Sequence, residues 1–299
     1  MKNSKFALIF VFISAIGWGL TGVLVKLLAP VSPFALTYHR LLIALIVSAP
    51  MILFLYRKKR DKFIGLKNPF GWILASLLAG YYLSATIAFQ LAPVAEVALL
   101  LTISPLFVLL IKLIINQKIH KNEYIGATLA FVGVIYILLP NLSFEFLSTK
   151  DHFLGNIFSI LSAFLTASYA TLYRSLHLKG SEPDTLIVSL ITLIIGVLAL
   201  SFLQEPDVSI INIGNIDWKN VEIYLLLGIF CTAIPTIGFA ISSKKLPSVI
   251  TASTSFLILI FTNVFSYIIL KETISSDMLF GSFIVLSGLG IMLTKKNLI

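Results

Sequence analysis

Charged side chains are scarce in the long apolar segments of this sequence, and three of them could bind a charged solute. Lys26, Arg40 and Glu96 each interrupt a run of apolar residues. A buried cation can hold a carboxylate or a phosphate, and a nearby glutamate can compete for that cation or carry a proton. A second interpretation is structural: the cations reach lipid headgroups, and Glu96 stabilises the start of a helix.

A stripe of polar and aromatic residues follows one face of segment 153–176. Its members recur every three or four positions, which places them on one side of a helix. They are Ser159, Ser162, Thr166, Tyr169 and Tyr173, and the matching face of segment 6–28 carries Ser14, Trp18 and Thr21. Aromatic rings with polar tips suit an amphipathic solute. The alternative is that each Ser or Thr bonds only to its own helix.

We expect solute contacts from these two faces and from two further segments. Segment 70–91 contributes neighbouring tyrosines, and segment 247–270 contributes an asparagine on a face shared with Ser253 and Tyr267. The expected substrate-binding residues are Trp18, Thr21, Tyr81, Tyr82, Thr166, Tyr169 and Asn263, with Arg40 and Glu96 as charge partners.

The composition indicates that lipid is the main solvent of this chain. Of its 299 residues, 58% are hydrophobic and 12% are charged, with a mean hydropathy of +1.01. Soluble domains are about half apolar and about a quarter charged. Long continuous apolar runs predict spanning helices rather than barrel strands. The predicted spans are 6–28, 34–56, 70–91, 94–115, 124–139, 153–176, 186–203, 221–242, 247–270 and 278–294.

Prolines and basic residues add detail to this arrangement. Pro105 and Pro235 fall inside predicted spans, where we expect kinks and a neighbour or water that satisfies the freed carbonyls. Most of the 22 lysines and arginines fall in connections on one side of the membrane. The positive-inside rule therefore predicts the cytoplasmic (inner) membrane with both termini in the cytoplasm.

The second half of the chain repeats the first. The spacing of Gln117, Gly126 and Gly133 is identical to that of Glu272, Gly281 and Gly288. We place the halves at residues 1–145 and 146–299. Each half crosses the bilayer an odd number of times, so the two must be inverted relative to each other. Inverted repeats around a central site are typical of secondary transporters.

Motifs for covalent or metal chemistry are missing from the sequence. The four histidines are scattered, the single cysteine is Cys231, and there is neither a phosphate-binding loop nor a nucleophile elbow. The positive charges fall in short connections rather than in a nucleic-acid-binding patch. We therefore expect no enzyme activity, metal, cofactor or nucleic-acid partner.

The chain resembles the EamA-type members of the drug/metabolite transporter superfamily over nearly its whole length. The resemblance rests on Gly17-Trp18-Gly19, Lys26, Arg40, Pro105, Gly126, Gly133, Ala163 through Arg174, Glu272, Gly281 and Gly288. The family pattern usually has an acidic residue at Gln117 and a proline at Ile260. The resemblance implies an all-α membrane protein with ten helices, arranged as two inverted five-helix repeats around a central cavity.

These observations predict a secondary active transporter of a small organic solute, such as an amino acid, a related metabolite or a drug. An alternative is a carrier of a nucleotide, nucleotide-sugar or other phosphorylated or anionic metabolite held by Arg40 or Lys26. Further alternatives are a non-transporting scaffold and a lipid-modifying enzyme. Membrane lipid is an expected partner. The glycines near positions 126–133 and 281–288 favour close helix contact, either within one protomer or across a homodimer.

Overall fold

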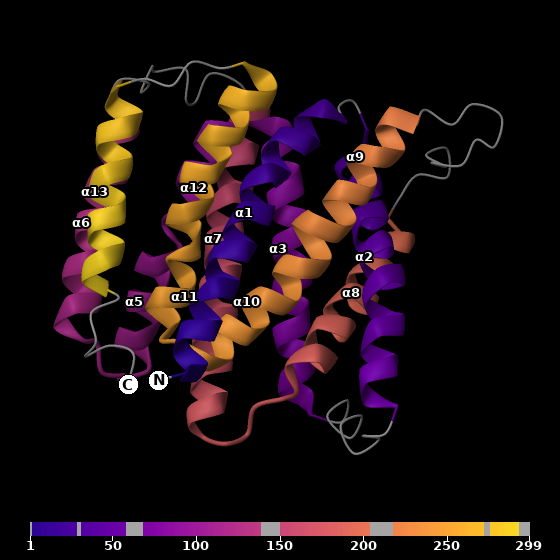
Figure 1. Cartoon of the computed structure of the whole chain (residues 1–299), viewed down its shortest axis with the longest axis horizontal. Coiled ribbons are helices and arrows are strands. Elements are labelled where there is room, and N and C mark those ends of the chain that lie inside the picture. Colours follow the sequence, from indigo (N-terminus) through magenta and orange to yellow (C-terminus); the bar gives the residue numbers. More distant parts are fainter. Residues whose placement is uncertain are drawn as a thin grey trace.

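The structure, a computed structural model, describes residues 2–28, 31–57, 68–138, 150–203, 218–271 and 276–292. Every regular element in these ranges is a helix, and the helices pack side by side (Figure 1). They are α1 (Lys2–Leu27), α2 (Pro33–Tyr56), α3 (Pro69–Leu91), α4 (Val94–Leu101), α5 (Ser104–Ile114), α6 (Lys121–Leu138), α7 (Lys150–Leu178), α8 (Thr185–Ser201), α9 (Trp218–Gly228), the π-helix η4 (Ile229–Ala233), α10 (Ile234–Lys245), α11 (Ser248–Ala252), α12 (Thr254–Phe265), the π-helix η5 (Ser266–Leu270) and α13 (Ser276–Met292). Glu272 and the proposed boundary at residues 145 and 146 lie outside the described residues.

Seven helical stretches of the described residues are long and apolar enough to cross a membrane. They are Phe6–Leu27, Pro33–Tyr56, Pro69–Leu91, Val94–Ile114, Lys150–Leu178, Asn220–Lys245 and Ser248–Leu270. Helices α6, α8 and α13 are shorter, at 18, 17 and 17 residues. The predicted all-α membrane fold is confirmed, and the helices are compatible with ten spans.

Local residues determine where several helices begin. The side chain of Asn68 accepts a hydrogen bond from the backbone N–H of Phe70 at 3.0 Å, which caps α3. Asp184 caps α8 in the same way through the N–H of Leu186, also at 3.0 Å. Each cap satisfies a backbone donor that has no partner within the helix. Pro33, at the first position of α2, costs no helix hydrogen bond there.

Three of the predicted spans are interrupted. Segment 94–115 forms two helices, α4 and α5, which are separated by Thr102 and Ile103 just before Pro105. Segment 247–270 is divided at Ser253 into α11 and α12. In segment 221–242, the π-helix η4 lies directly before the first turn of α10, and that turn contains Pro235. Proline has no N–H to donate and so favours such breaks.

A neighbouring side chain satisfies a carbonyl that Pro235 leaves without its usual α-helical donor. That donor would be the N–H of residue 235, which would bond to the carbonyl of Cys231. The Nη2 atom of Arg40 donates to this carbonyl instead, at 3.0 Å. Arg40 on α2 therefore stabilises the irregular part of the α9–α10 span.

Glycines of the two halves meet where α6 and α13 cross at one edge of the bundle (Figure 1). A Cβ atom added to Gly126 would lie 2.6 Å from the carbonyl oxygen of Gly288. One added to Gly133 would lie 2.8 Å from the carbonyl oxygen of Gly281. The order is reversed along the two helices, so they run antiparallel. These small-residue faces are thus used within the chain.

The polar faces of α1 and α7 point into the bundle. Ser14 and Ser162 are both 0% exposed, and Trp18 is 3% exposed. Helix α1 packs against α10 and α12, whereas α7 packs against α3. The opposite faces carry exposed apolar side chains such as Phe12 and Phe164, as expected for surfaces in contact with lipid.

Candidate functional site

A small internal cavity lies where the interrupted helices meet. Its volume is about 10 Å³, which is close to the minimum for one water molecule. It is lined from helices of both halves by Trp18, Tyr81, Leu101, Ser104, Thr166, Phe239, Ala252, Thr254, Ser255 and Ile258. Sites for organic ligands usually have volumes of about 300–1,000 Å³, so the walls must separate before a solute can enter.

Aromatic rings form much of the cavity wall and its support. The ring centroid of Trp18 lies 5.0 Å from that of Tyr81 and 4.9 Å from that of Phe239. Tyr169 stacks on the other side of this group, 5.6 Å from Phe239 with an interplanar angle of 28°. The rings come from α1, α3, α7 and α10. A movement of one of these helices would therefore change the ring packing against the others.

Polar groups are present on the same wall. The hydroxyl oxygens of Ser104 and Thr166 are 3.1 Å apart. Trp18 brings its buried Nε1 atom to the wall, whereas the buried hydroxyl of Tyr169 belongs to a residue that packs against Phe239 and does not line the cavity. Helices α5 and α12 begin at the cavity, with Ser104 and Thr254 as their first residues. Helices α4 and α11 end at the same cavity, with Leu101 and Ala252 as their last residues, so partial charges of both signs meet there.

Arg40 supports this wall from behind rather than lining it. Its Nε donates to the hydroxyl of Thr232 at 2.9 Å, and its guanidinium carbon lies 5.0 Å from the ring centroid of Tyr82. Its Nη1 contacts the hydroxyl of Thr86 at 3.4 Å. The side chain is 1% exposed, and each of its three guanidinium nitrogens donates to a protein group.

The expected cluster of Lys26, Arg40 and Glu96 is not formed in the described part of the chain. Lys26 Nζ donates to the carbonyl of Gln90 at 3.4 Å. Glu96 Oε2 lies 3.3 Å from His152 Nε2 at the start of α7. The expected approach of the three charges was wrong because Lys26 bonds to the end of α3, Arg40 bonds to η4 and α3, and Glu96 contacts α7.

The remaining expected residues are buried but are not among the cavity-lining residues. The hydroxyl of Thr21 donates to the carbonyl of Gly17 in its own helix at 3.3 Å. The hydroxyl oxygens of Tyr82 and Thr236 are 2.6 Å apart. Asn263 is 6% exposed on α12, whereas Tyr267, expected on the same face, is 51% exposed.

Sequence reasoning predicted three of the ten lining residues, Trp18, Tyr81 and Thr166, and missed the other seven. Phe239 contacts both Trp18 and Tyr169, and only its position one turn after Pro235 could have drawn attention to it. Ser104 and Thr254 were also missed. The Ser104-Pro105 pair marks a helix start by its proline, but nothing in the sequence marks the break at Ser253 before Thr254.

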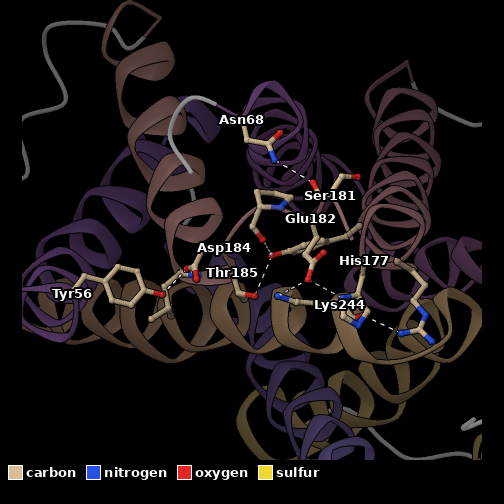
Figure 2. A network of polar contacts seen from close by, with 12 residues as sticks. Tyr56, Asn68, His177, Ser181, Glu182, Asp184, Thr185 and Lys244 are labelled. Atoms are coloured by element: carbon tan, nitrogen blue, oxygen red, sulfur yellow. Dashed lines mark hydrogen bonds and ion pairs between the residues drawn. The ribbon is translucent and has the colours of Figure 1, made fainter. Parts of the chain in front are cut away.

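A polar network connects several helix ends at one end of the bundle (Figure 2). Glu182, between α7 and α8, accepts from Lys244 Nζ at 3.1 Å and contacts His177 Nδ1 at 3.0 Å. Nearby, the hydroxyl of Tyr56 donates to Asp184 at 2.5 Å, and Asn68 Nδ2 donates to the carbonyl of Ser181 at 3.2 Å.

The same network shifts the pKa of Glu182. Burial raises that pKa, but hydrogen bonds from His177, from its own backbone and from Lys244 outweigh the burial. The pKa of Glu182 therefore lies below its ordinary value of 4.5. The network holds the α7–α8 connection against the end of α10.

Comparison with known proteins agrees with this architecture. The model of the EamA-like transporter family matches the chain twice, over residues 5–139 and 153–294. Two Archaeoglobus fulgidus proteins, each named "Uncharacterized transporter", are similar to it. One is 28% identical over 94% of this chain and 95% of its own length, and the other is 24% identical over 99% of each.

Two further comparisons cover nearly the whole chain. A Clostridium kluyveri protein, also named "Uncharacterized transporter", is 25% identical over 94% of this chain and 90% of its own. A solved crystal structure shares the fold with a TM-score of 0.72 at 18% identity, covering 97% of this chain and 98% of that one. The family match covers both halves of the sequence, so this chain belongs to the EamA-like transporter family and is a membrane transporter.

Proposed function

We propose that this transporter is a secondary carrier of a small amphipathic organic solute, either an amino acid or a chemically related metabolite. The observation that carries the proposal is the cavity between the helix breaks, which combines Trp18, Tyr81 and Phe239 with hydroxyl groups. Interrupted helices that meet at a central site are the usual substrate-binding arrangement of such carriers.

The chemistry of the wall favours a solute with an apolar part and a carboxylate. The aromatic rings offer an apolar surface, and the first residues of α5 and α12, Ser104 and Thr254, lie on the cavity. The hydroxyl groups of Ser104 and Thr254 can donate hydrogen bonds to a carboxylate. The indole N–H of Trp18 adds a polar group to the aromatic part of the wall. Arg40 is engaged by protein groups, so the alternative of a phosphorylated solute held by Arg40 gains no support.

The mechanism follows from two inverted halves that exchange inward-open and outward-open shapes around this cavity. The antiparallel crossing of α6 and α13 supports it. Gly126 meets Gly288, the counterpart of Gly133, while Gly133 meets Gly281, the counterpart of Gly126. A twofold axis in the membrane plane produces this reciprocal exchange of partners.

The proposed location is the cytoplasmic membrane, with both termini in the cytoplasm. The positive-inside rule supports this orientation. The hydroxyl of Ser242 donates to the carbonyl of Ala7 at 3.0 Å, which places the end of α10 beside the start of α1. The basic residues Lys244 and Lys245 therefore lie at the same end of the bundle as the start of the chain.

Uptake into proteoliposomes tests the proposal. Wild-type protein should accumulate at least one radiolabelled amino acid or related metabolite, identified first by thermal stabilisation in a solute library. A Trp18→Ala and Tyr81→Ala double variant should lose this uptake. The control is Tyr267→Ala, because Tyr267 is 51% exposed on η5 and does not line the cavity. Unchanged uptake by a folded double variant would remove the proposed site.

A further inference from the structure

Two cavities adjoin each other at the end of the bundle where α5 and α7 finish. One is a basic pocket of about 330 Å³ whose lining includes Lys112, Lys118, Glu123 and Arg174. The other is a mostly apolar groove of about 610 Å³ along α3, α5 and α7. Gln117 lines both cavities, and its Nε2 donates to the hydroxyl of Ser175 at 3.4 Å.

The basic pocket has an excess of positive charge. Lys112 and Glu123 neutralise each other through a buried contact of 2.9 Å. Lys118 and Arg174 have no ion pair among the described residues. Arg174 is held in place because its Nη1 donates to the carbonyls of Lys244 and Lys245, both at 3.1 Å. The pocket thus presents an oriented guanidinium and an exposed lysine, and neither has an anionic partner among the described residues.

The groove has a mostly apolar surface, with hydroxyl side chains of α7 along it and Lys179 at one end. Ile115 and Phe164 in its wall are 46% and 43% exposed, so the groove opens on the outer surface of the bundle. Ser168 and Ser175 lie on α7 at helical spacing, and Lys179 follows just beyond the end of that helix. An acyl chain fits the apolar part, whereas a soluble anion gains nothing from it.

We propose that these joined cavities bind one anionic phospholipid, with its phosphate in the basic pocket and an acyl chain in the groove. Basic pockets between membrane helices are the usual sites for anionic headgroups. Charge complementarity to Lys118, Arg174 and Lys179 selects the headgroup, and the apolar walls select a lipid over a free phosphate. The inference is independent of the transported solute.

Native mass spectrometry of the detergent-purified protein tests this lipid site. Phosphatidylglycerol should bind the wild type about tenfold more tightly than phosphatidylcholine, because its headgroup has a net negative charge. A Lys118→Gln and Lys179→Gln double variant should lose this preference. The matched control is Lys150→Gln with Lys271→Gln, which removes the same charge at other helix ends. An unchanged preference in the Lys118/Lys179 variant would overturn the proposal.

Two further measurements separate the lipid from other sources of phosphate. Ser168→Phe fills the groove without a change in charge, so it should weaken phosphatidylglycerol binding while the lipid-free melting temperature stays near the wild-type value. Unchanged lipid binding by this variant would rule out the groove. Glycerol phosphate and inorganic phosphate should stabilise the protein much less than the lipid does. Equal stabilisation would assign the pocket to a soluble anion and overturn the proposal. These measurements report lipid binding and stability rather than transport, so they can be interpreted whatever the outcome of the uptake assay.

Discussion

Gly126 and Gly288 face each other so closely that a Cβ atom on either would lie 2.6 Å from the carbonyl oxygen of the other. This mutual contact joins the last helix of one half of the sequence to the last helix of the other. A methyl group on either side would have to displace backbone atoms, which cannot move independently of their helices. The contact therefore predicts a strict requirement for glycine at these two positions.

Gly288→Ala should destabilise the protein by about 1–3 kcal/mol, because the added methyl group overpacks the α6–α13 crossing. The control is Gly290→Ala on the same helix, where an added Cβ meets nothing within 4 Å. That substitution should be neutral or stabilising by about 0.5–1 kcal/mol, because alanine favours helix over glycine. Reversible unfolding in mixed micelles measures both. Equal effects of the two variants would contradict the proposed packing.

Lys112→Met should destabilise the protein by about 3–5 kcal/mol, because it leaves a buried carboxylate without its cation. Glu123 is 0% exposed and lies 2.9 Å from Lys112 Nζ. The double variant Lys112→Met with Glu123→Met removes both charges and should be clearly more stable than the single variant. A double-mutant cycle by the same unfolding assay measures the coupling. If the changes in unfolding free energy of the two single variants add up to that of the double variant, the ion pair contributes no coupling energy, and the prediction is wrong.

Arg40→Met should lower stability, because it leaves the carbonyl of Cys231 and the hydroxyl of Thr232 without their buried donor. Each unsatisfied group costs about 1–3 kcal/mol. The control is Arg57→Met, at the exposed end of the same helix. Thermal unfolding and uptake should fall together in Arg40→Met. A variant with wild-type stability and no uptake would instead identify Arg40 as a solute contact.

The lowered pKa of Glu182 predicts that the stability of the protein changes with pH in the acid range. Its pKa is lower in the folded protein than its ordinary value of 4.5, so its stabilising effect is present above that pH. The effect is lost as the pH falls through the lower folded pKa. Wild type should therefore exceed Glu182→Gln in melting temperature near neutral pH, and the difference should shrink below about pH 4.5. A constant difference across this range would exclude the ionised carboxylate as its cause.

The sequence predicted the helices and the inward face of α7 well, because both depend on local periodicity. Ser162 and Tyr169 recur at helical spacing, and both are 0% exposed. Trp18, Tyr81 and Thr166 were expected at the site for similar reasons, and they line the cavity. Their role as solute contacts remains a prediction.

Long-range partners were harder to predict, because periodicity gives the face of a helix but not its neighbour. Arg40 was expected near Glu96, but it reaches a carbonyl in the π-helix before Pro235. The proline predicts a freed carbonyl there but not which side chain satisfies it. Glu96 instead contacts His152, which is distant in sequence. Phe239 was missed because one phenylalanine in an apolar span carries no signal until its neighbours are known.

The central claim is that the cavity between the helix breaks is the solute site and opens alternately to the two sides. Ser255 lines this cavity, and Cys231 is the single cysteine and is buried. The direct test is labelling of Ser255→Cys, in a Cys231→Ala background, with a membrane-impermeant maleimide applied separately to each face of proteoliposomes. The account predicts labelling from both faces and slower labelling when the transported solute is present. Labelling from one face alone, at a rate that the solute does not change, would contradict it.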